Sequence, residues 1–157
     1  EIKDRGYEIK VADNGTGMTP EEVNRFYLRV GAERRKDERG DKSKKFGRKV
    51  MGNKGVGKLA PFGICHQIEL LSAGGNLTTG KDESGKSAKG YLRAHLILDR
   101  DGILKDEEFD YEPMVGQLDR TVTKSTGTVI TLRTFAYRRV PAISRPCASC
   151  ARSTRRC

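Results

Sequence analysis

A carboxylate and two alternating glycines stand together in the sequence DNGTGM, which runs from Asp13 to Met18. A carboxylate at the end of a strand can accept a hydrogen bond from an exocyclic amine, such as the N6 group of adenine. Gly15 and Gly17 would let the backbone approach a flat ring, because they carry no side chain to collide with it. An ordinary Asx-type turn explains the same residues equally well, so this motif by itself does not define a site.

A glycine-rich stretch with two lysines, GNKGVGK, ends a long basic segment. Free backbone N–H groups at the start of a helix bind phosphate, and lysines add charge-assisted hydrogen bonds to the same oxygens. The stretch therefore predicts a phosphate site that would use Gly52, Lys54, Gly55, Val56, Gly57 and Lys58.

Two better-known nucleotide motifs nearly match the same stretch. A Walker A motif fits as far as Lys58, but Leu59 then stands where a magnesium-binding Ser or Thr is needed. A dinucleotide motif fits from Gly55 to Ala60. Both motifs require a buried hydrophobic strand just upstream, and the sequence there is KSKKFGRKVMGNK. The context therefore excludes both.

A third polar stretch, STGT at residues 125–128, precedes a segment rich in β-branched residues. A hydroxyl such as that of Thr128 can hold a water molecule or bond a base edge. Most threonines in strands do neither, so this motif is weak when taken alone.

The elements that would position these motifs follow from periodicity and turn chemistry. Tyr7 to Ala12 alternates apolar and charged residues, which predicts a half-buried strand. Thr19, Pro20 and Glu22 form the capping box of a helix, whose apolar stripe is Val23, Phe26, Tyr27 and Val30. A second, short helix is expected within GVGKLAPFGIC.

Three further strands are expected at His66 to Ser72, Gly90 to Leu98 and Thr128 to Phe135. Turns are expected at Gly74-Gly75-Asn76 and at Asp99 to Gly102. This order predicts an α+β fold, a two-layer sandwich in which helices cover one face of a mostly antiparallel sheet.

The charge of the chain is concentrated in two places. The formal net charge is +10, and residues 29–58 hold 12 Lys and Arg against 4 Asp and Glu. The last 20 residues hold 6 Arg and no acid. Such basic segments leave open a second function, a nucleic-acid-binding module that uses the loop and the tail, although no aromatic residues are interleaved with them on one face.

Composition sets the class and the boundaries of the domain. No apolar run is long enough to cross a bilayer, so we expect a soluble, cytoplasmic protein without a membrane partner. Cys147 and Cys150 form a CxxC pair without enough further ligands, so we expect no metal site there. We expect one domain over residues 1–137, a mobile loop over 29–58 and a disordered tail over 138–157, whose arginine-rich sequence resembles a frameshift product.

Together, DNGTGM, GNKGVGK and STGT resemble, in this order, the motifs of the gyrase, heat-shock chaperone, histidine kinase and mismatch-repair (GHKL) ATPase superfamily. The resemblance covers roughly Tyr7 to Phe135. It implies a Bergerat-type fold that binds ATP with Mg²⁺, a lid that closes over the phosphates, and a homodimer of the longer parent protein. By this resemblance, Asp13 would bind adenine. Gly15, Gly17 and Met18 would surround the base, and Thr128 would support it.

One motif of the superfamily has no counterpart in this sequence. The superfamily carries a catalytic Glu and a magnesium-binding Asn on a helix before the first of these motifs, and here only Glu1 to Ala12 precede Asp13. The fold is therefore expected to be incomplete, with no catalytic residue assigned. Without a positioned general base, hydrolysis slows roughly 100- to 10,000-fold. We expect the parent to be an ATPase and this chain to bind ATP; a histidine-kinase-like catalytic domain is the remaining alternative.

Overall fold

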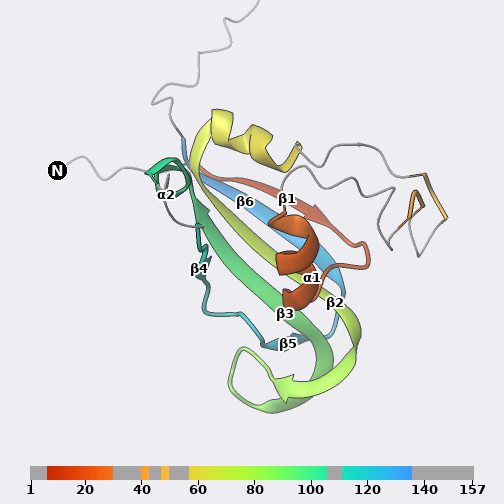
Figure 1. Ribbon diagram of the computed structural model, residues 1–157. Coiled ribbons are helices and arrows are strands. Elements are labelled where there is room, and N and C mark those ends of the chain that lie inside the picture. Colours follow the sequence, from red (N-terminus) through yellow and green to blue (C-terminus); the bar gives the residue numbers. More distant parts are fainter. Residues whose placement is uncertain (1–6, 30–39, 43–46, 50–56, 106–110, 136–157) are drawn as a thin grey trace, which may run out of the picture.

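A six-stranded antiparallel sheet forms the centre of the computed structural model, which describes residues 7–29, 40–42, 47–49, 57–105 and 111–135 (Figure 1). The strand order is β1-β6-β2-β3-β4, and β5 pairs with β3 outside this path. The predicted α+β fold with an antiparallel sheet is confirmed, and the sheet is open rather than closed. The strands are β1 (Ile9–Asp13), β2 (Cys65–Lys81), β3 (Ser87–Asp99), β4 (Met114–Val115), β5 (Val122–Thr123) and β6 (Gly127–Phe135).

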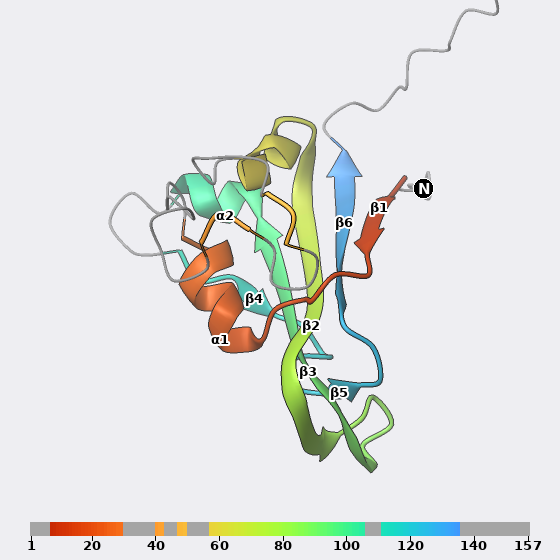
Figure 2. The same cartoon turned by 90° about the vertical axis from the view of Figure 1, so that its right-hand side faces the viewer.

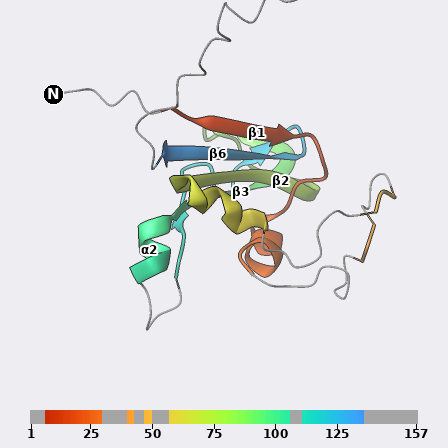
Figure 3. The ribbon, with the colours of Figure 1, turned by 90° about the horizontal axis from the view of Figure 1, so that it is seen from above.

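The described helices lie on one face of this sheet, as the views along its edge and from above show (Figures 2 and 3). They are short: α1 (Pro20–Glu22), the π-helical turn η1 (Val23–Tyr27), the 3₁₀ helix η3 (Gly57–Gly63) and α2 (Arg100–Lys105). α1 contacts β3, η3 contacts β2, and α2 contacts both of these strands. The predicted two-layer arrangement therefore holds for the part of the chain that the structure describes.

The predicted capping box at the start of α1 is present. The Glu22 N–H donates to the Thr19 hydroxyl over 3.2 Å, and the Thr19 N–H donates to the Glu22 carboxylate over 2.9 Å. Pro20 occupies the first turn, where its missing N–H leaves no bond unmade. The cap fixes where the chain leaves the DNGTGM loop and enters the helical layer.

The core lies between these helices and the central strands. One cluster joins Val23 of η1 to Leu70, Ala94 and Leu96, and a second joins Cys65, Ile68, Leu98 and Leu132. Each fully buried aliphatic side chain of this kind stabilises the fold by about 1.5–3 kcal/mol. The core thus holds β2, β3 and β6 beneath α1 and η3.

The turn predicted at Gly74-Gly75-Asn76 is wrong, because β2 continues through these residues as far as Lys81. The pairing of β2 with β3 shifts register between Gly74 and Thr78, and the chain reverses later, at residues 82–86. There the Asp82 carboxylate accepts hydrogen bonds from the Ser84 and Lys86 N–H groups, over 2.9 and 3.0 Å.

The turn predicted at Asp99 to Gly102 is also wrong, since the residues after Asp99 begin α2. The Asp99 carboxylate accepts a hydrogen bond from the Gly102 N–H over 2.8 Å, so a residue type common in turns caps a helix instead. The strand predicted to be half-buried at Tyr7 to Ala12 forms as β1, but every residue of β1 is exposed. No described helix covers this edge of the sheet.

Several expectations fall outside the described residues. These include most of the basic loop, the whole of the tail at 138–157, and the phosphate-site candidates Gly52, Lys54, Gly55 and Val56. Among the residues that are described, no helix has the length and apolar composition needed to cross a membrane.

Candidate functional site

Asp13 and Thr128 face each other across the β1–β6 pair. They are directly opposed in the antiparallel register, so their side chains project from the same face of the sheet. Val11, Ile130 and Leu132 project from the same face, because side chains alternate along each strand. Ile130 and Leu132 belong to the core beneath the helices, so this is the face that the helices cover. Asp13 is exposed and Thr128 is half-buried. A carboxylate and a hydroxyl are thus presented side by side to the space above the sheet.

A hydrogen bond joins the loops that carry these two residues. The Thr126 hydroxyl donates to the backbone oxygen of Gly15 over 2.8 Å, and the two residues are 111 positions apart in sequence. Within the first loop the Gly15 N–H donates to the Asp13 carboxylate over 2.8 Å, which is the Asx-type bond expected from the sequence. The structure therefore brings the DNGTGM and STGT motifs together.

Gly17 allows the loop to lie directly on β2. Its φ angle is +62°, which disfavours any residue with a side chain, and an added Cβ would collide with the backbone oxygen of Ala73. Gly74 meets it from the other side, since a Cβ there would lie 2.7 Å from the backbone of Gly17 and Met18. The glycines of the loop and of β2 thus permit a close backbone-to-backbone contact.

Ser72 joins both motifs from beneath, and sequence reasoning did not select it. Its side chain is 1% exposed. The Met18 N–H donates to its oxygen over 2.9 Å, and its oxygen lies 2.9 Å from that of Thr128 and 3.3 Å from the backbone oxygen of Gly127. A lone serine in an apolar strand carries no signal that distinguishes this role from ordinary packing.

A cavity of about 220 Å³ adjoins this junction. It lies around the start of β6 and the neighbouring strands. Residues of β1, β2, β3, β5 and β6 and of the segment before β6 line it, among them Asp13, Ser72, Arg93, Thr126 and Thr128.

Lys58 lies elsewhere in the structure. Its ammonium group donates to the backbone oxygens of Phe26 and Arg29, over 3.2 and 2.5 Å, and stands 5.7 Å from the centre of the Tyr27 ring. Carbonyl groups at the end of a helical turn attract a cation. Burial raises the pKa of the Tyr27 phenol, so that this ring stays neutral beside the lysine.

Lys58 lines a separate, largely apolar cavity of about 230 Å³ and is not brought to Asp13. Gly57, its neighbour, begins η3 and is exposed.

The opposite face of the sheet carries a chain of charges that is internally paired. The Leu118 N–H donates to Nδ1 of His95 over 3.1 Å, so the neutral ring carries its proton on Nε2. That nitrogen lies 2.9 Å from the Glu69 carboxylate, whose other oxygen lies 2.8 Å from Arg133. These partners satisfy one another, so the network supports the sheet rather than forming a second site.

The described residues contain no cluster of three or more His, Cys, Asp or Glu side chains suited to holding a metal ion. The tail cysteines considered above lie outside that part of the chain.

A candidate type II restriction enzyme of Herpetosiphon aurantiacus, HgiDII, is 33% identical to this chain over 147 residues. The match covers 93% of this chain and 24% of that protein, so the chain spans about a quarter of the length of its relative.

The sequence profile of the family described as "Histidine kinase-, DNA gyrase B-, and HSP90-like ATPase" matches residues 2–106. That range contains the DNGTGM motif, the glycine-rich stretch and the β2–β3 hairpin, and it covers most of the chain. The open antiparallel sheet with helices on one face is the fold that the GHKL motifs imply. The chain therefore belongs to the family of histidine kinase-, DNA gyrase B- and HSP90-like ATPases.

Proposed function

We propose that residues 1–137 bind ATP, with the adenine base held between the DNGTGM loop and the start of β6. Asp13 accepts a hydrogen bond from the N6 amino group, Gly15, Gly17 and Met18 form the backbone wall beside the ring, and Thr128 bonds the base edge. The observation that carries this proposal is the pairing of Asp13 with Thr128 across two strands whose loops are joined by the Thr126–Gly15 hydrogen bond.

The residues present fit an adenine ring in two respects. The Asp13 carboxylate is exposed, and the bond from Gly15 uses one of its roughly four acceptor positions. Gly15 and Gly17 keep side-chain atoms away from the ring.

Mg²⁺ commonly binds through substrate phosphates and few protein carboxylates. We therefore propose that Mg²⁺ enters together with the triphosphate.

The phosphates would be held by Gly52, Lys54, Gly55, Val56, Gly57 and Lys58. In the described structure Lys58 bonds the carbonyl oxygens of Phe26 and Arg29. Binding of a triphosphate would exchange these neutral acceptors for charged ones, which form stronger hydrogen bonds. We propose that this exchange accompanies closure of residues 29–58 over the nucleotide.

ATP hydrolysis and homodimerisation are proposed for the longer protein, because this chain spans 24% of its relative. The positioned general base that hydrolysis needs is assigned to no residue of this chain.

Calorimetric titration with a non-hydrolysable ATP analogue and Mg²⁺ tests the binding proposal. We expect a dissociation constant between about 1 µM and 1 mM, the range typical of enzyme substrates. Adenosine should bind more weakly than the analogue, because it lacks the phosphates. Absence of heat from a chain whose folding is verified by circular dichroism would contradict the proposal.

Limited trypsin digestion tests the closure of residues 29–58, which hold 12 Lys and Arg. The ATP analogue should slow cleavage within this segment, while cleavage at the Lys81 to Lys89 hairpin should keep its rate. Equal cleavage of the segment with and without the analogue would contradict lid closure.

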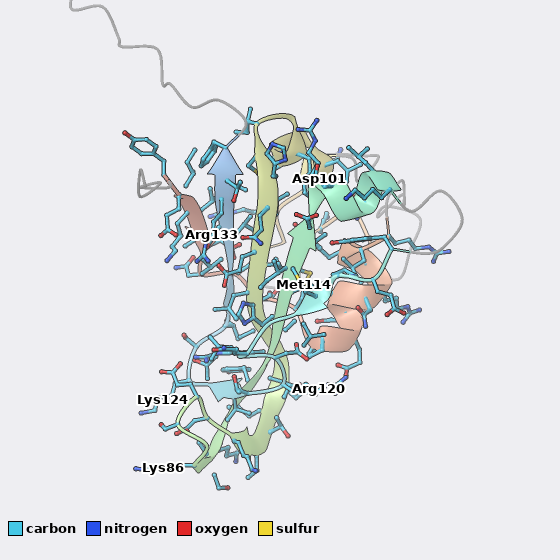
Figure 4. All side chains as sticks on the ribbon, turned by 90° about the vertical axis from the view of Figure 1, so that its left-hand side faces the viewer. Lys86, Asp101, Met114, Arg120, Lys124 and Arg133 are labelled. Atoms are coloured by element: carbon cyan, nitrogen blue, oxygen red, sulfur yellow. The ribbon has the colours of Figure 1, made fainter. Side chains whose placement is uncertain are left out.

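Nucleic-acid binding is the second candidate. The net charge of +10 favours it, as does the name of the relative, a candidate restriction enzyme. Lys86 and Lys124 add positive charge at the hairpin end of the described structure (Figure 4). This function predicts DNA affinity that falls steeply as salt is raised and that does not respond to ATP.

A further inference from the structure

We infer that Ser72 is a specificity-determining residue, which fixes the direction of the Thr128 hydroxyl and thereby makes the site accept adenine and reject 6-oxopurines. This inference rests on the proposed adenine site. It concerns a residue that makes no contact with the base and acts through Thr128.

The hydrogen-bond inventory around Ser72 decides the direction. A hydroxyl has one hydrogen to donate and two lone pairs. The Met18 N–H donates to Ser72 over 2.9 Å and occupies one lone pair. The single Ser72 hydrogen has two available acceptors, the Thr128 hydroxyl oxygen at 2.9 Å and the backbone oxygen of Gly127 at 3.3 Å.

The two distances favour Thr128 as the acceptor. Hydrogen bonds between hydroxyl donors and oxygen acceptors span about 2.5–3.0 Å, so the contact with Thr128 is within this range and the bond to Gly127, at 3.3 Å, is longer and weaker. Ser72 is 1% exposed, so water does not offer a competing acceptor. In our assignment the shorter contact receives the Ser72 hydrogen, so the bonds run from Met18 to Ser72 to Thr128.

This direction leaves the hydrogen of Thr128 for the ligand. Asp13, directly opposite, is an acceptor, so the site presents an acceptor beside a donor. Adenine is complementary to this pair, because its N6 amino group donates and its N1 accepts. Hypoxanthine has the reverse pattern, with an accepting O6 and a donating N1–H. Its O6 would face the Asp13 carboxylate, acceptor against acceptor, and its N1–H would face the Thr128 hydrogen, donor against donor, so both contacts would be unfavourable.

Removal of the Ser72 hydroxyl frees Thr128 to turn. The Thr128 oxygen can then accept from N1–H of hypoxanthine. The preference of the site for adenine should fall by the contribution of about one hydrogen bond. A hydrogen bond contributes about 0.5–1.5 kcal/mol, so the ratio of ATP to inosine triphosphate affinity should fall about 3- to 10-fold. A purely structural role for Ser72 would instead weaken both nucleotides equally.

The test measures the affinity ratio of ATP to inosine triphosphate, by calorimetry with Mg²⁺, in the full chain and in four variants. The wild type should prefer ATP, Ser72→Ala should show the reduced ratio, and Thr128→Val should reduce it as well. In Ser72→Ala/Thr128→Val the serine change should add nothing, because its effect passes through Thr128. Thr131→Val, which removes a buried hydroxyl of β6 on the other face of the sheet, should leave the ratio unchanged.

An unchanged ratio in Ser72→Ala, or an additive effect in the double variant, would overturn the inference. Binding of neither nucleotide by the wild type would overturn the proposed function together with it. Ser72→Cys supplies the same test if Ser72→Ala does not fold, because a thiol keeps the side chain but donates weakly.

Discussion

The Thr126 hydroxyl and the backbone oxygen of Gly15 form a hydrogen bond of 2.8 Å that ties the loop after β1 to the loop before β6. Thr121 makes a similar bond of 2.7 Å to the backbone oxygen of Leu118, away from the candidate site. The two threonines therefore form a matched pair for separating binding from stability.

Thr126→Val should weaken binding of the ATP analogue about 3- to 10-fold, because it removes a bond that aligns the two motifs. Thr121→Val should lower the free energy of unfolding by about 1 kcal/mol and leave binding of the ATP analogue unchanged. Urea denaturation and calorimetry measure the two quantities. Equal affinities for the two variants would show that the Thr126 bond does not organise the site.

Gly17→Ala should destabilise the fold and abolish nucleotide binding, because the new Cβ would collide with the Ala73 oxygen at a φ angle of +62°. Gly85→Ala is the control, since Gly85 has a φ angle of +80° but nothing within 4 Å of the added Cβ. The unfavourable backbone alone costs about 1–3 kcal/mol in each variant. Urea midpoints should fall further for Gly17→Ala, and similar midpoints would mean that the contact with β2 is not tight.

Lys58→Gln should weaken ATP binding about 10- to 100-fold, because a charge-assisted hydrogen bond contributes about 1.5–3 kcal/mol. Adenosine binding should stay the same, since the proposed role of Lys58 concerns the phosphates alone. Lys86→Gln, on the hairpin, is the matched control and should change neither affinity. A loss of adenosine binding in Lys58→Gln would instead assign Lys58 a structural role at the end of η1.

Asp82→Asn should destabilise the β2–β3 hairpin at neutral pH. A backbone hydrogen bond from Lys86 chiefly lowers the pKa of the Asp82 carboxyl, so the ionised form stabilises the folded chain. This contribution is present above the unfolded pKa and disappears as the pH falls through the lower folded value. The difference in urea midpoint between wild type and variant should therefore shrink below about pH 4. A difference that stays constant from pH 7 to pH 3 would contradict the assignment.

Much of the framework was predictable because it depends on local chemistry. The capping box of Thr19 and Glu22, the strand before Asp13 and the α+β class follow from spacing and periodicity. The order of the three motifs pointed to the family that the comparison shows.

The misplaced turns have a different origin. Gly74 reads locally as a turn former, but its lack of a side chain serves contact with Gly17 and Met18, which lie more than 50 positions earlier. Asp99 was expected in a turn and caps α2 instead. In both cases the residue type indicated a special backbone position, and tertiary contacts decided which one.

Ser72 could not be found from the sequence, because its importance depends on three partners that come from two other segments. The same holds for the placement of Lys58 at the carbonyls of Phe26 and Arg29. Such roles become visible once the sheet register is known.

The most direct test of the central claim is calorimetric titration of the ATP analogue, with Mg²⁺, into the wild type and Asp13→Asn. Asp101→Asn, which alters an exposed carboxylate on α2, is the control (Figure 4). The proposed adenine site predicts measurable binding by the wild type and the control, and an affinity about 10- to 100-fold lower for Asp13→Asn. Equal affinities for Asp13→Asn and the wild type would contradict the assignment of Asp13 to adenine.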